Sequence, residues 1–82
     1  MTQTRILVVE DEALFARAVG RRLEKAGFLV SVAGTLREAE QQRQAQPPDL
    51  LLLDMRLPDG SGLDFLQRLR AESGGGAAVI AM

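Results

Sequence analysis

Three carboxylates stand at the ends of two apolar runs that lie far apart in the sequence. Glu10 and Asp11 follow the run ILVV at residues 6–9, and Asp54 follows the run LLLL at residues 50–53. A buried strand that ends in carboxylates places charge at the rim of a sheet, so the three groups converge if the strands are neighbours. Such a cluster repels itself unless a cation holds it together, and Mg²⁺ is a cation that prefers oxygen ligands.

The chemistry open to such a cluster is phosphoryl transfer. A bound Mg²⁺ brings a phosphoryl group to a carboxylate that is free to attack, and the product is an aspartyl phosphate. Asp54 is the better candidate nucleophile because it stands alone at a strand end. The competing interpretation of any single acid after a strand is helix capping, and Asp11 could cap the following helix. Three acids at one rim favour the metal site over capping.

Composition excludes several classes of function. The 82 residues carry 10 basic and 11 acidic side chains, which gives no electrostatic footprint for nucleic acid or an anionic membrane. The sequence contains no cysteine and no histidine, which excludes disulfides, thiolate chemistry, Ser-His-Asp catalysis and the common zinc sites. No apolar run approaches ~20 residues and no signal-peptide pattern is present, so we expect one small domain in the cytoplasm.

Hydrophobic periodicity predicts the elements that position the acids. Residues 5–9 are typical of a buried strand, and residues 12–26 change to helical spacing, with Gly27 as the C-cap. The residues expected to face inward from this helix are Phe15, Ala18, Val19, Leu23 and Ala26. A second strand follows at residues 28–32.

Cap and turn residues mark the second half of the chain. Thr35 and Glu38 fit a capping box that starts a second helix, and prolines 47 and 48 end it. Residues 50–53 are a third, central strand, and residues 55–60 are a loop. Ser61 caps a third helix. Leu63, Leu66 and Leu69 are expected to face inward from that helix, and residues 77–82 form a fourth strand.

The predicted order is β-α-β-α-β-α-β, an α/β fold with a parallel sheet and right-handed crossovers. The most apolar strands, the first and third, should be central, which gives the strand order 2-1-3-4. Ligands of such sheets bind at the carboxyl ends of the strands, where the direction of winding reverses. Glu10, Asp11 and Asp54 all follow strands at that point, so we expect them to meet there.

Two segments of the chain resemble the signatures of receiver domains of two-component response regulators. These are ILVVEDE at residues 6–12 and LLLLDMRLPDGSG at residues 50–62, and the resemblance runs from about residue 4 to residue 82. It implies a flavodoxin-like, three-layer fold. Residues 1–82 would form the N-terminal portion of a receiver domain, without its fourth helix, fifth strand and fifth helix.

The resemblance implies roles for the matching residues. Asp54 would be the phosphoacceptor, and Glu10, Asp11, Asp54 and the backbone carbonyl of Arg56 would hold Mg²⁺. Pro58 and Gly62 match the loop that follows the phosphoacceptor in the family. A sensor histidine kinase would be the phosphoryl donor, and the domain would be a signalling module that regulates transcription rather than an enzyme.

Two features of the sequence depart from the family pattern. A Thr or Ser after the fourth strand and a Lys after the fifth normally bind the phosphoryl group, but Lys25 is the only lysine and no Ser or Thr follows Ser73. Glu40 and Arg43 stand where larger apolar residues are usual in the second helix. We therefore expect a fragment or a natural truncation that tends to self-associate through an uncovered sheet face and edge.

Two alternatives remain open at this point. The chain could be a receiver-like interaction module without phosphotransfer, because the switch residues are missing. It could also be a small aspartyl-phosphate phosphohydrolase similar to the haloacid dehalogenase superfamily. That superfamily requires a second Asp two residues after the nucleophile, where this chain has Arg56. A phosphorylation assay with a small donor separates the first alternative from the receiver interpretation.

Overall fold

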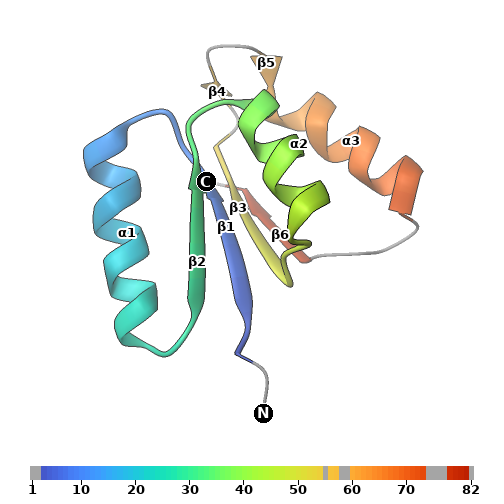
Figure 1. Cartoon of the computed structure of the whole chain (residues 1–82). Helices are drawn as coiled ribbons and strands as arrows, with labels where there is room; N and C mark the ends of the chain where they lie inside the picture. Colours follow the sequence, from blue (N-terminus) through green and yellow to red (C-terminus); the bar gives the residue numbers. More distant parts are fainter. Residues whose placement is uncertain (1–2, 55, 58–59, 74–77, 82) are drawn as a thin grey trace.

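The computed structural model describes residues 3–54, 56–57, 60–73 and 78–81 (Figure 1). Strands and helices alternate along most of the chain, as the periodicity predicts. The elements are β1 (Arg5–Val9), α1 (Ala13–Lys25), β2 (Leu29–Ala33), α2 (Leu36–Ala45), β3 (Leu50–Leu53), β4 (Arg56–Leu57), β5 (Gly60–Ser61), α3 (Gly62–Ser73) and β6 (Ala78–Ala81).

The main sheet has the order β2-β1-β3-β6, and each pair of neighbours is parallel. This confirms the predicted order 2-1-3-4 and the α/β, flavodoxin-like class. The segment predicted as a loop differs, because β4 and β5 form a short antiparallel pair in which Leu57 lies opposite Gly60. Residues 58 and 59 of the predicted loop lie outside the described residues.

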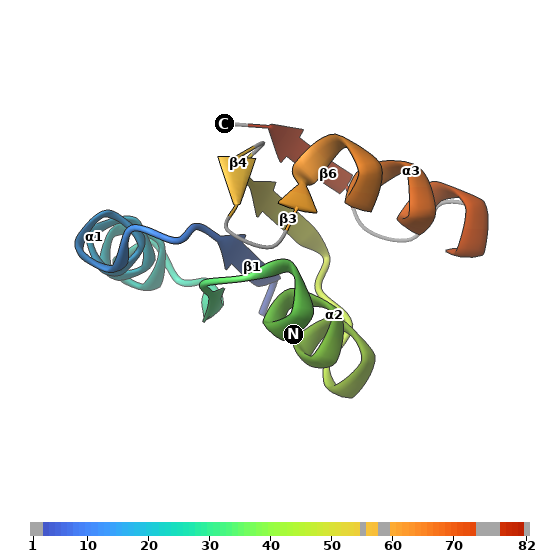
Figure 2. The ribbon, with the colours of Figure 1, turned by 90° about the horizontal axis from the view of Figure 1, so that it is seen from above.

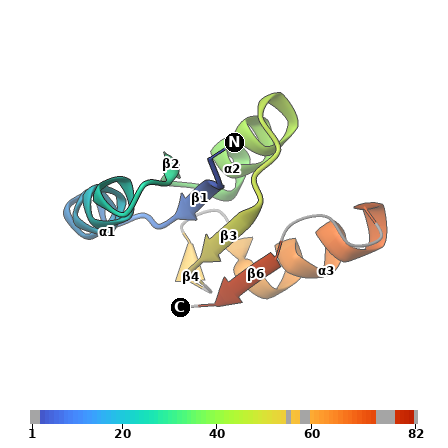
Figure 3. The same ribbon diagram turned by 90° about the horizontal axis from the view of Figure 1, so that it is seen from below.

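The helices lie on two sides of the sheet. Seen along the strands, α1 lies on one side, near β2, and α2 and α3 lie on the other (Figure 2). The opposite view shows the same separation (Figure 3). Right-handed crossovers require this division, because the chain moves from β1 outward to β2 and then back across β1 to β3.

The hydrophobic core lies on the side of α2 and α3. Alternating residues of the two central strands belong to it, together with Phe65 of α3. The buried residues of this core are Leu7, Val9, Ala33, Leu36, Ala39, Leu51, Leu53 and Phe65. On the α1 side, Ile6 and Val8 of β1 are also buried, whereas Leu50 and Leu52 of β3 are only partly buried.

Small residues form the contact between α1 and the sheet. Ala16 and Gly20 are buried, and a methyl group placed on Gly20 would lie 3.5 Å from Cγ1 of Val30 in β2. The prediction that Phe15 and Ala18 face inward is wrong, since Phe15 is 48% exposed and Ala18 is exposed. The helix lies over the edge strand β2 through its smallest side chains, so larger ones are pushed to its flanks.

Two other residues of α1 that were predicted to face inward do lie closer to the sheet. Val19 and Leu23 are partly buried beside the small contact residues, but Ala26 is exposed after the helix ends. In α3 the inward prediction is wrong for Leu63, which is 53% exposed. Leu66 packs partly buried against the core, and Phe65 provides the fully buried side chain that the pattern of leucines did not indicate.

The predicted helix ends are confirmed in detail. Gly27 has φ +99°, and the amides of Gly27 and Phe28 donate to the carbonyls of Glu24 and Leu23, the paired bonds of a Schellman motif. Thr35 Oγ1 accepts the Glu38 amide at 3.1 Å. The Glu38 side chain returns to the amide of Gly34, one residue earlier than in the usual capping box.

The third helix also begins as predicted. Ser61 Oγ accepts the amide of Leu63 at 3.2 Å, which satisfies one of the free donors of the first turn of α3. None of the helices in the described part of the chain is long and apolar enough to cross a membrane.

Candidate metal and phosphoryl site

Backbone hydrogen bonds hold the ends of three strands together at the carboxyl edge of the sheet. The amide of Glu10 donates to the carbonyl of Ala33 at 2.9 Å, which extends the pairing of β1 with β2. The amide of Asp54 donates to the carbonyl of Val9 at 3.0 Å, which extends the pairing of β3 with β1. The two acidic segments are therefore fixed beside each other by the sheet itself.

The three predicted acids meet at this edge. Glu10, Asp11 and Asp54 each offer a carboxylate oxygen, and these oxygens all lie within 4.8 Å of one another. Asp11 is exposed, whereas Glu10 and Asp54 are partly buried. Two like charges at such a separation repel by about 1 kcal/mol in bulk water and by more at a partly buried rim. The cluster is electrostatically costly without a cation.

The pKa of Glu10 reflects this repulsion. Burial raises the pKa of its carboxyl above the ordinary value of 4.5, and the nearby charge of Asp54 raises it further. A hydrogen bond from the Glu12 amide to Oε1 of Glu10, 3.1 Å long, opposes this increase. This local hydrogen bond was not predicted from the sequence. The sequence feature that could have indicated the bond is an acidic residue, Glu10, two positions before the N-cap residue of the helix.

The capping interpretation of Asp11 is wrong. The N-cap of α1 is Glu12, and that end of the helix has no side-chain capping bond. Asp11 therefore precedes α1 without capping it, and its carboxylate is one of the three at the sheet edge. The competing explanation for an acid in this position is removed by the geometry.

The oxygen positions fit a small divalent cation. Mg²⁺ binds oxygen at about 2.1 Å in octahedral geometry, so opposite ligands lie about 4.2 Å apart. Carboxylate oxygens within 4.8 Å of one another can close on such an ion with small side-chain movements, or through its retained waters. Hard oxygen donors without sulfur or imidazole also suit Mg²⁺ better than zinc or copper.

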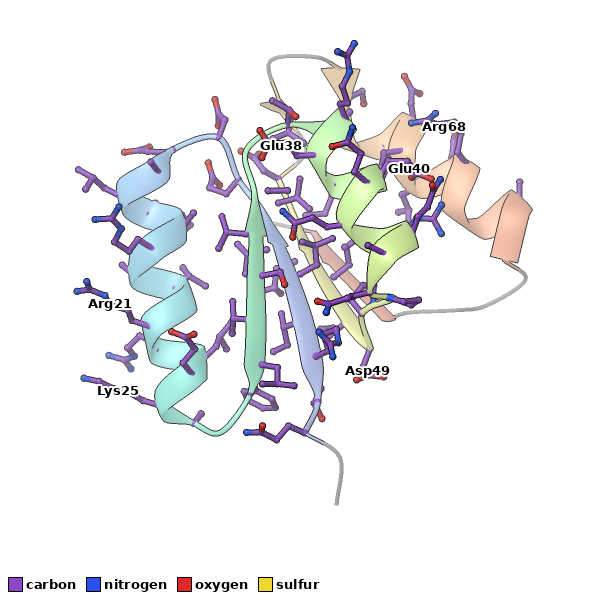
Figure 4. All side chains as sticks on the ribbon, viewed as in Figure 1. Arg21, Lys25, Glu38, Glu40, Asp49 and Arg68 are labelled. Atoms are coloured by element: carbon purple, nitrogen blue, oxygen red, sulfur yellow. The ribbon has the colours of Figure 1, made fainter. Side chains whose placement is uncertain are left out.

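The structure says less about the other residues that were expected near the site. Arg56 begins β4, two residues after Asp54, and the metal role of its carbonyl stays a prediction. The neighbouring Met55 lies outside the described residues. Lys25 lies in the last turn of α1, at the end opposite the acids, and points away from the sheet (Figure 4). It does not reach the carboxylate cluster.

Comparison with known proteins identifies a family. The family profile described as "Response regulator receiver domain" matches residues 6–82. The acid tolerance regulatory protein ActR of Rhizobium meliloti is 37% identical over 65 residues, which cover 79% of this chain and 34% of ActR. The phosphate regulon transcriptional regulatory protein PhoB of Escherichia coli is 46% identical over 69 residues, which cover 84% of this chain and 30% of PhoB.

Solved structures show the same fold. The non-phosphorylated HemR receiver domain from Leptospira biflexa has a TM-score of 0.85 and 32% identity, over 96% of this chain and 64% of that chain. The MaeR response regulator bound to beryllium trifluoride has a TM-score of 0.88 and 34% identity, over 98% of this chain and 66% of that chain. The chain spans about a third of the length of the curated relatives it matches.

Proposed function

The chain belongs to the response regulator receiver domain family, the phosphoacceptor domains of two-component systems, and we propose that Asp54 is its phosphoacceptor. We further propose that Glu10, Asp11, Asp54 and the backbone carbonyl of Arg56 hold Mg²⁺. One observation carries the proposal: the three carboxylates converge within 4.8 Å where the winding of the sheet reverses. Residues 1–82 are, on this proposal, the N-terminal portion of a receiver domain.

The proposed reaction is an in-line phosphoryl transfer. A carboxylate oxygen of Asp54 forms a bond to phosphorus while the bond from phosphorus to the donor breaks, and the donor leaves with its electron pair. The product is an acyl phosphate on Asp54. Mg²⁺ held by these residues would supply positive charge against the carboxylates and the phosphoryl oxygens. Glu10 and Asp11 would hold the ion and would not themselves attack.

The proposed partner is a sensor histidine kinase whose phosphohistidine is the donor. We place this exchange in the cytoplasm and assign the segment a signalling role that is not enzymatic and involves no direct nucleic-acid contact. Association with a second chain through the uncovered sheet face and edge is part of the proposal.

Phosphoryl uptake by this chain should be slow. The family signature places a hydroxyl and a lysine around the phosphoryl group, but this chain has no Ser or Thr after Ser73 and no lysine except Lys25. Each missing donor removes stabilisation of the transferring phosphoryl charge, and losing one such donor costs roughly 100-fold or more in rate in other enzymes. Labelling therefore has to be followed over hours.

Phosphorylation by a small donor tests the proposal. The chain is incubated with acetyl phosphate and Mg²⁺, and intact mass spectrometry measures the fraction carrying one phosphoryl group. We expect slow labelling that Asp54→Ala abolishes and Asp11→Ala reduces. The matched control is Asp64→Ala, an exposed carboxylate in the first turn of α3, which should label like the unchanged chain. Equal labelling of the Asp54→Ala chain would refute the assignment.

Metal binding is tested separately from phosphoryl transfer. A divalent ion that binds only the folded chain raises its melting temperature by linkage. We expect millimolar Mg²⁺ to raise the midpoint, and a chelator to reverse the effect. The combined change of Glu10 and Asp11 to Asn or Gln should remove the dependence. If the folded chain melts at one temperature with and without Mg²⁺, the metal site is wrong even where labelling occurs.

A further inference from the structure

Helices α2 and α3 enclose a groove on the side of the sheet opposite α1. The groove has a volume of about 340 Å³. Its two walls belong to the crossovers from β2 to β3 and from β3 to β6, and each crossover begins and ends on a described strand (Figure 1). The side chain of Arg68 contributes the α3 wall. The residues that line the groove are Leu36, Arg37, Glu40, Gln41, Gln44 and Arg68.

The α2 wall carries an ion pair in a partly buried position. Glu40 accepts hydrogen bonds from Nε of Arg43 at 3.2 Å and from Nε2 of Gln44 at 2.9 Å, and Nη2 of Arg43 completes the ion pair. The Arg43 side chain is 21% exposed and the Glu40 side chain 28%. A pair that is desolvated in this way adds little stability compared with apolar side chains of similar size. Stability alone therefore does not account for the polar lining of the groove.

On the α3 wall, an aromatic ring holds Arg68 in place. The Arg68 guanidinium lies over the Phe65 ring, 5.7 Å from its centroid, which covers one face of the guanidinium and leaves the N–H groups at its edge. Arg68 and Glu40 face each other across the groove (Figure 4). Within the described part of the chain, Arg68 donates no hydrogen bond and forms no ion pair. Its donors are therefore available to a ligand.

Positive charge exceeds negative charge around the groove. Arg37, Arg43 and Arg68 provide three guanidinium groups against the one carboxylate of Glu40. That carboxylate already accepts three hydrogen bonds from its own helix, so it has little capacity left for Arg68. A second carboxylate is the group that best matches this surplus, because a guanidinium binds a carboxylate through two parallel hydrogen bonds.

The shape of the groove favours a peptide segment over a small molecule. Arg37, Gln41, Gln44 and Arg68 are all exposed, so the groove is open to solvent along its length. Small ligands usually lie in sites that bury most of their surface. Helix α2 rises about 10 Å from Arg37 to Gln44, which is the length of about three extended residues. A segment held in place by the rest of its own protein does not need an enclosed site.

We propose that the groove between α2 and α3 binds an extended acidic segment of a partner protein. Arg68 bonds one carboxylate of the segment, and Arg37 attracts its neighbouring acids along the α2 wall. The amides of Gln41 and Gln44 lie beside this path, where they can bond the backbone of the segment. The proposal requires neither a metal ion nor phosphoryl transfer at Asp54, so its failure and the failure of the phosphoacceptor assignment are independent.

Titration with a short acidic peptide tests the occupant. The probe is an acetylated, amidated tetraglutamate peptide, whose carboxylates are all on side chains, and NMR amide shifts report its binding to the 82-residue chain. We expect tetraglutamate to shift amides of α2 and α3, and the matched tetraglutamine peptide to shift none. Shifts centred on α1 would overturn the site. Equal affinity for glutarate, a free dicarboxylate, would overturn the peptide as occupant.

Two exposed arginines provide the matched comparison of variants. Arg68→Gln and Arg21→Gln remove the same charge from a helix surface at little cost in helix propensity, but Arg21 lies on α1 and points away from the sheet (Figure 4). Arg68→Gln should weaken tetraglutamate binding by roughly 10-fold or more, whereas Arg21→Gln should leave it nearly unchanged. Arg68→Lys should restore only part of the affinity, because lysine lacks the planar fork. Equal weakening by the two glutamine variants would show general charge attraction and overturn the proposal.

Glu40 provides a test with the opposite sign. Glu40→Gln removes the carboxylate that faces Arg68, so it should strengthen tetraglutamate binding several-fold. The control is Glu24→Gln, which removes an exposed carboxylate from α1 and should have little effect. A role of Glu40 in folding alone would not increase affinity for an acidic peptide. Unchanged or weaker binding by the folded Glu40→Gln chain, or an equal gain in the two variants, would contradict the proposal.

Discussion

The two sides of the central sheet share the same strands but bury them unequally. On the side of α2 and α3, the β3 residues Leu51 and Leu53 are buried in one cluster with Phe65 and Leu36. On the α1 side, the intervening leucines of β3 stay partly exposed, although the strand is equally apolar on both faces. An apolar strand therefore permits burial on both faces but does not by itself produce it. The helices that cover each face decide how much of it is buried.

The same contrast extends to how the helices contact the sheet. α1 meets β2 through Ala16 and Gly20, so its backbone approaches closely but little side-chain area is buried. Phe65 of α3 instead places a large aromatic ring in the core, at 1% exposure. Since hydrophobic stabilisation scales with apolar area removed from water, the α3 side should carry most of the free energy of folding.

The largest expected effect comes from adjacent leucines on opposite faces of β3. Leu51→Ala removes a fully buried side chain and should lower the free energy of unfolding by about 2–5 kcal/mol. Leu52→Ala removes a partly exposed one and should cost roughly half as much in the monomer. Urea unfolding monitored by circular dichroism measures both. Equal losses in dilute solution would contradict the comparison of the two faces.

A second expected effect compares the first turns of α2 and α1. Thr35 caps α2 through the Glu38 amide, and Thr35→Ala should destabilise the chain by about 1 kcal/mol. The N-cap of α1 is Glu12, which has an extended backbone and no side-chain cap. Glu12→Ser should therefore stabilise by roughly 0.5 kcal/mol through a new capping bond. Thermal melts of the two variants should shift in opposite directions, and shifts of one sign would disprove the assignment of the caps.

A third effect concerns the close contact of α1 with β2. Gly20→Ala should stabilise the chain by about 0.5–1 kcal/mol, because alanine is the better helix former. The added methyl group would lie 3.5 Å from Val30 and 3.9 Å from Val32, which are ordinary contact distances. Gly20→Leu should destabilise, since a larger side chain forces the helix away from the strand. Destabilisation by alanine would show that the helix lies closer to the sheet than described.

Sequence patterns predicted the strands and their order better than the residues by which the helices contact the sheet. Strands β1 and β3, their parallel order and the meeting of the three acids all follow from apolar runs bounded by charge. The inward residues of α1 and α3 did not follow, because periodicity locates an apolar stripe but not the point at which it touches a neighbour. Phe15 is apolar yet 48% exposed, and its helical spacing gives no sign of this.

The candidate site was also predicted only in part. The carboxylates could be placed because topology alone brings strand ends together. The bond from the Glu12 amide to Glu10 could not, because it depends on side-chain rotamers at the sheet rim. The role of Arg56 depends on backbone orientation in a segment where the predicted loop is a short β pair.

The smallest expected effect is a difference in pH dependence between the α2 side of the sheet and its carboxyl edge. On α2, the hydrogen bond from Arg43 lowers the pKa of the Glu40 carboxyl below 4.5, assisted by Gln44 and the charge of Arg68 and opposed by burial. Glu40 and Arg68 face each other between α2 and α3 (Figure 4). A lowered native pKa means that the folded state favours the ionised form, so Glu40 contributes stability above pH 4.5 that is lost as the pH falls through its native pKa.

Glu10 has the opposite sign in Mg²⁺-free buffer. Its raised pKa favours the protonated form in the folded chain, so its contribution is present below pH 4.5 and is lost as the pH rises through the native pKa. Glu40→Gln should therefore reduce the acid destabilisation of the chain, whereas Glu10→Gln should flatten the dependence at higher pH. Urea midpoints measured across the acid range separate the two, and each effect should be small because both carboxyls are partly solvated. Parallel pH profiles for the two variants would show that the rim and the α2 side do not differ electrostatically.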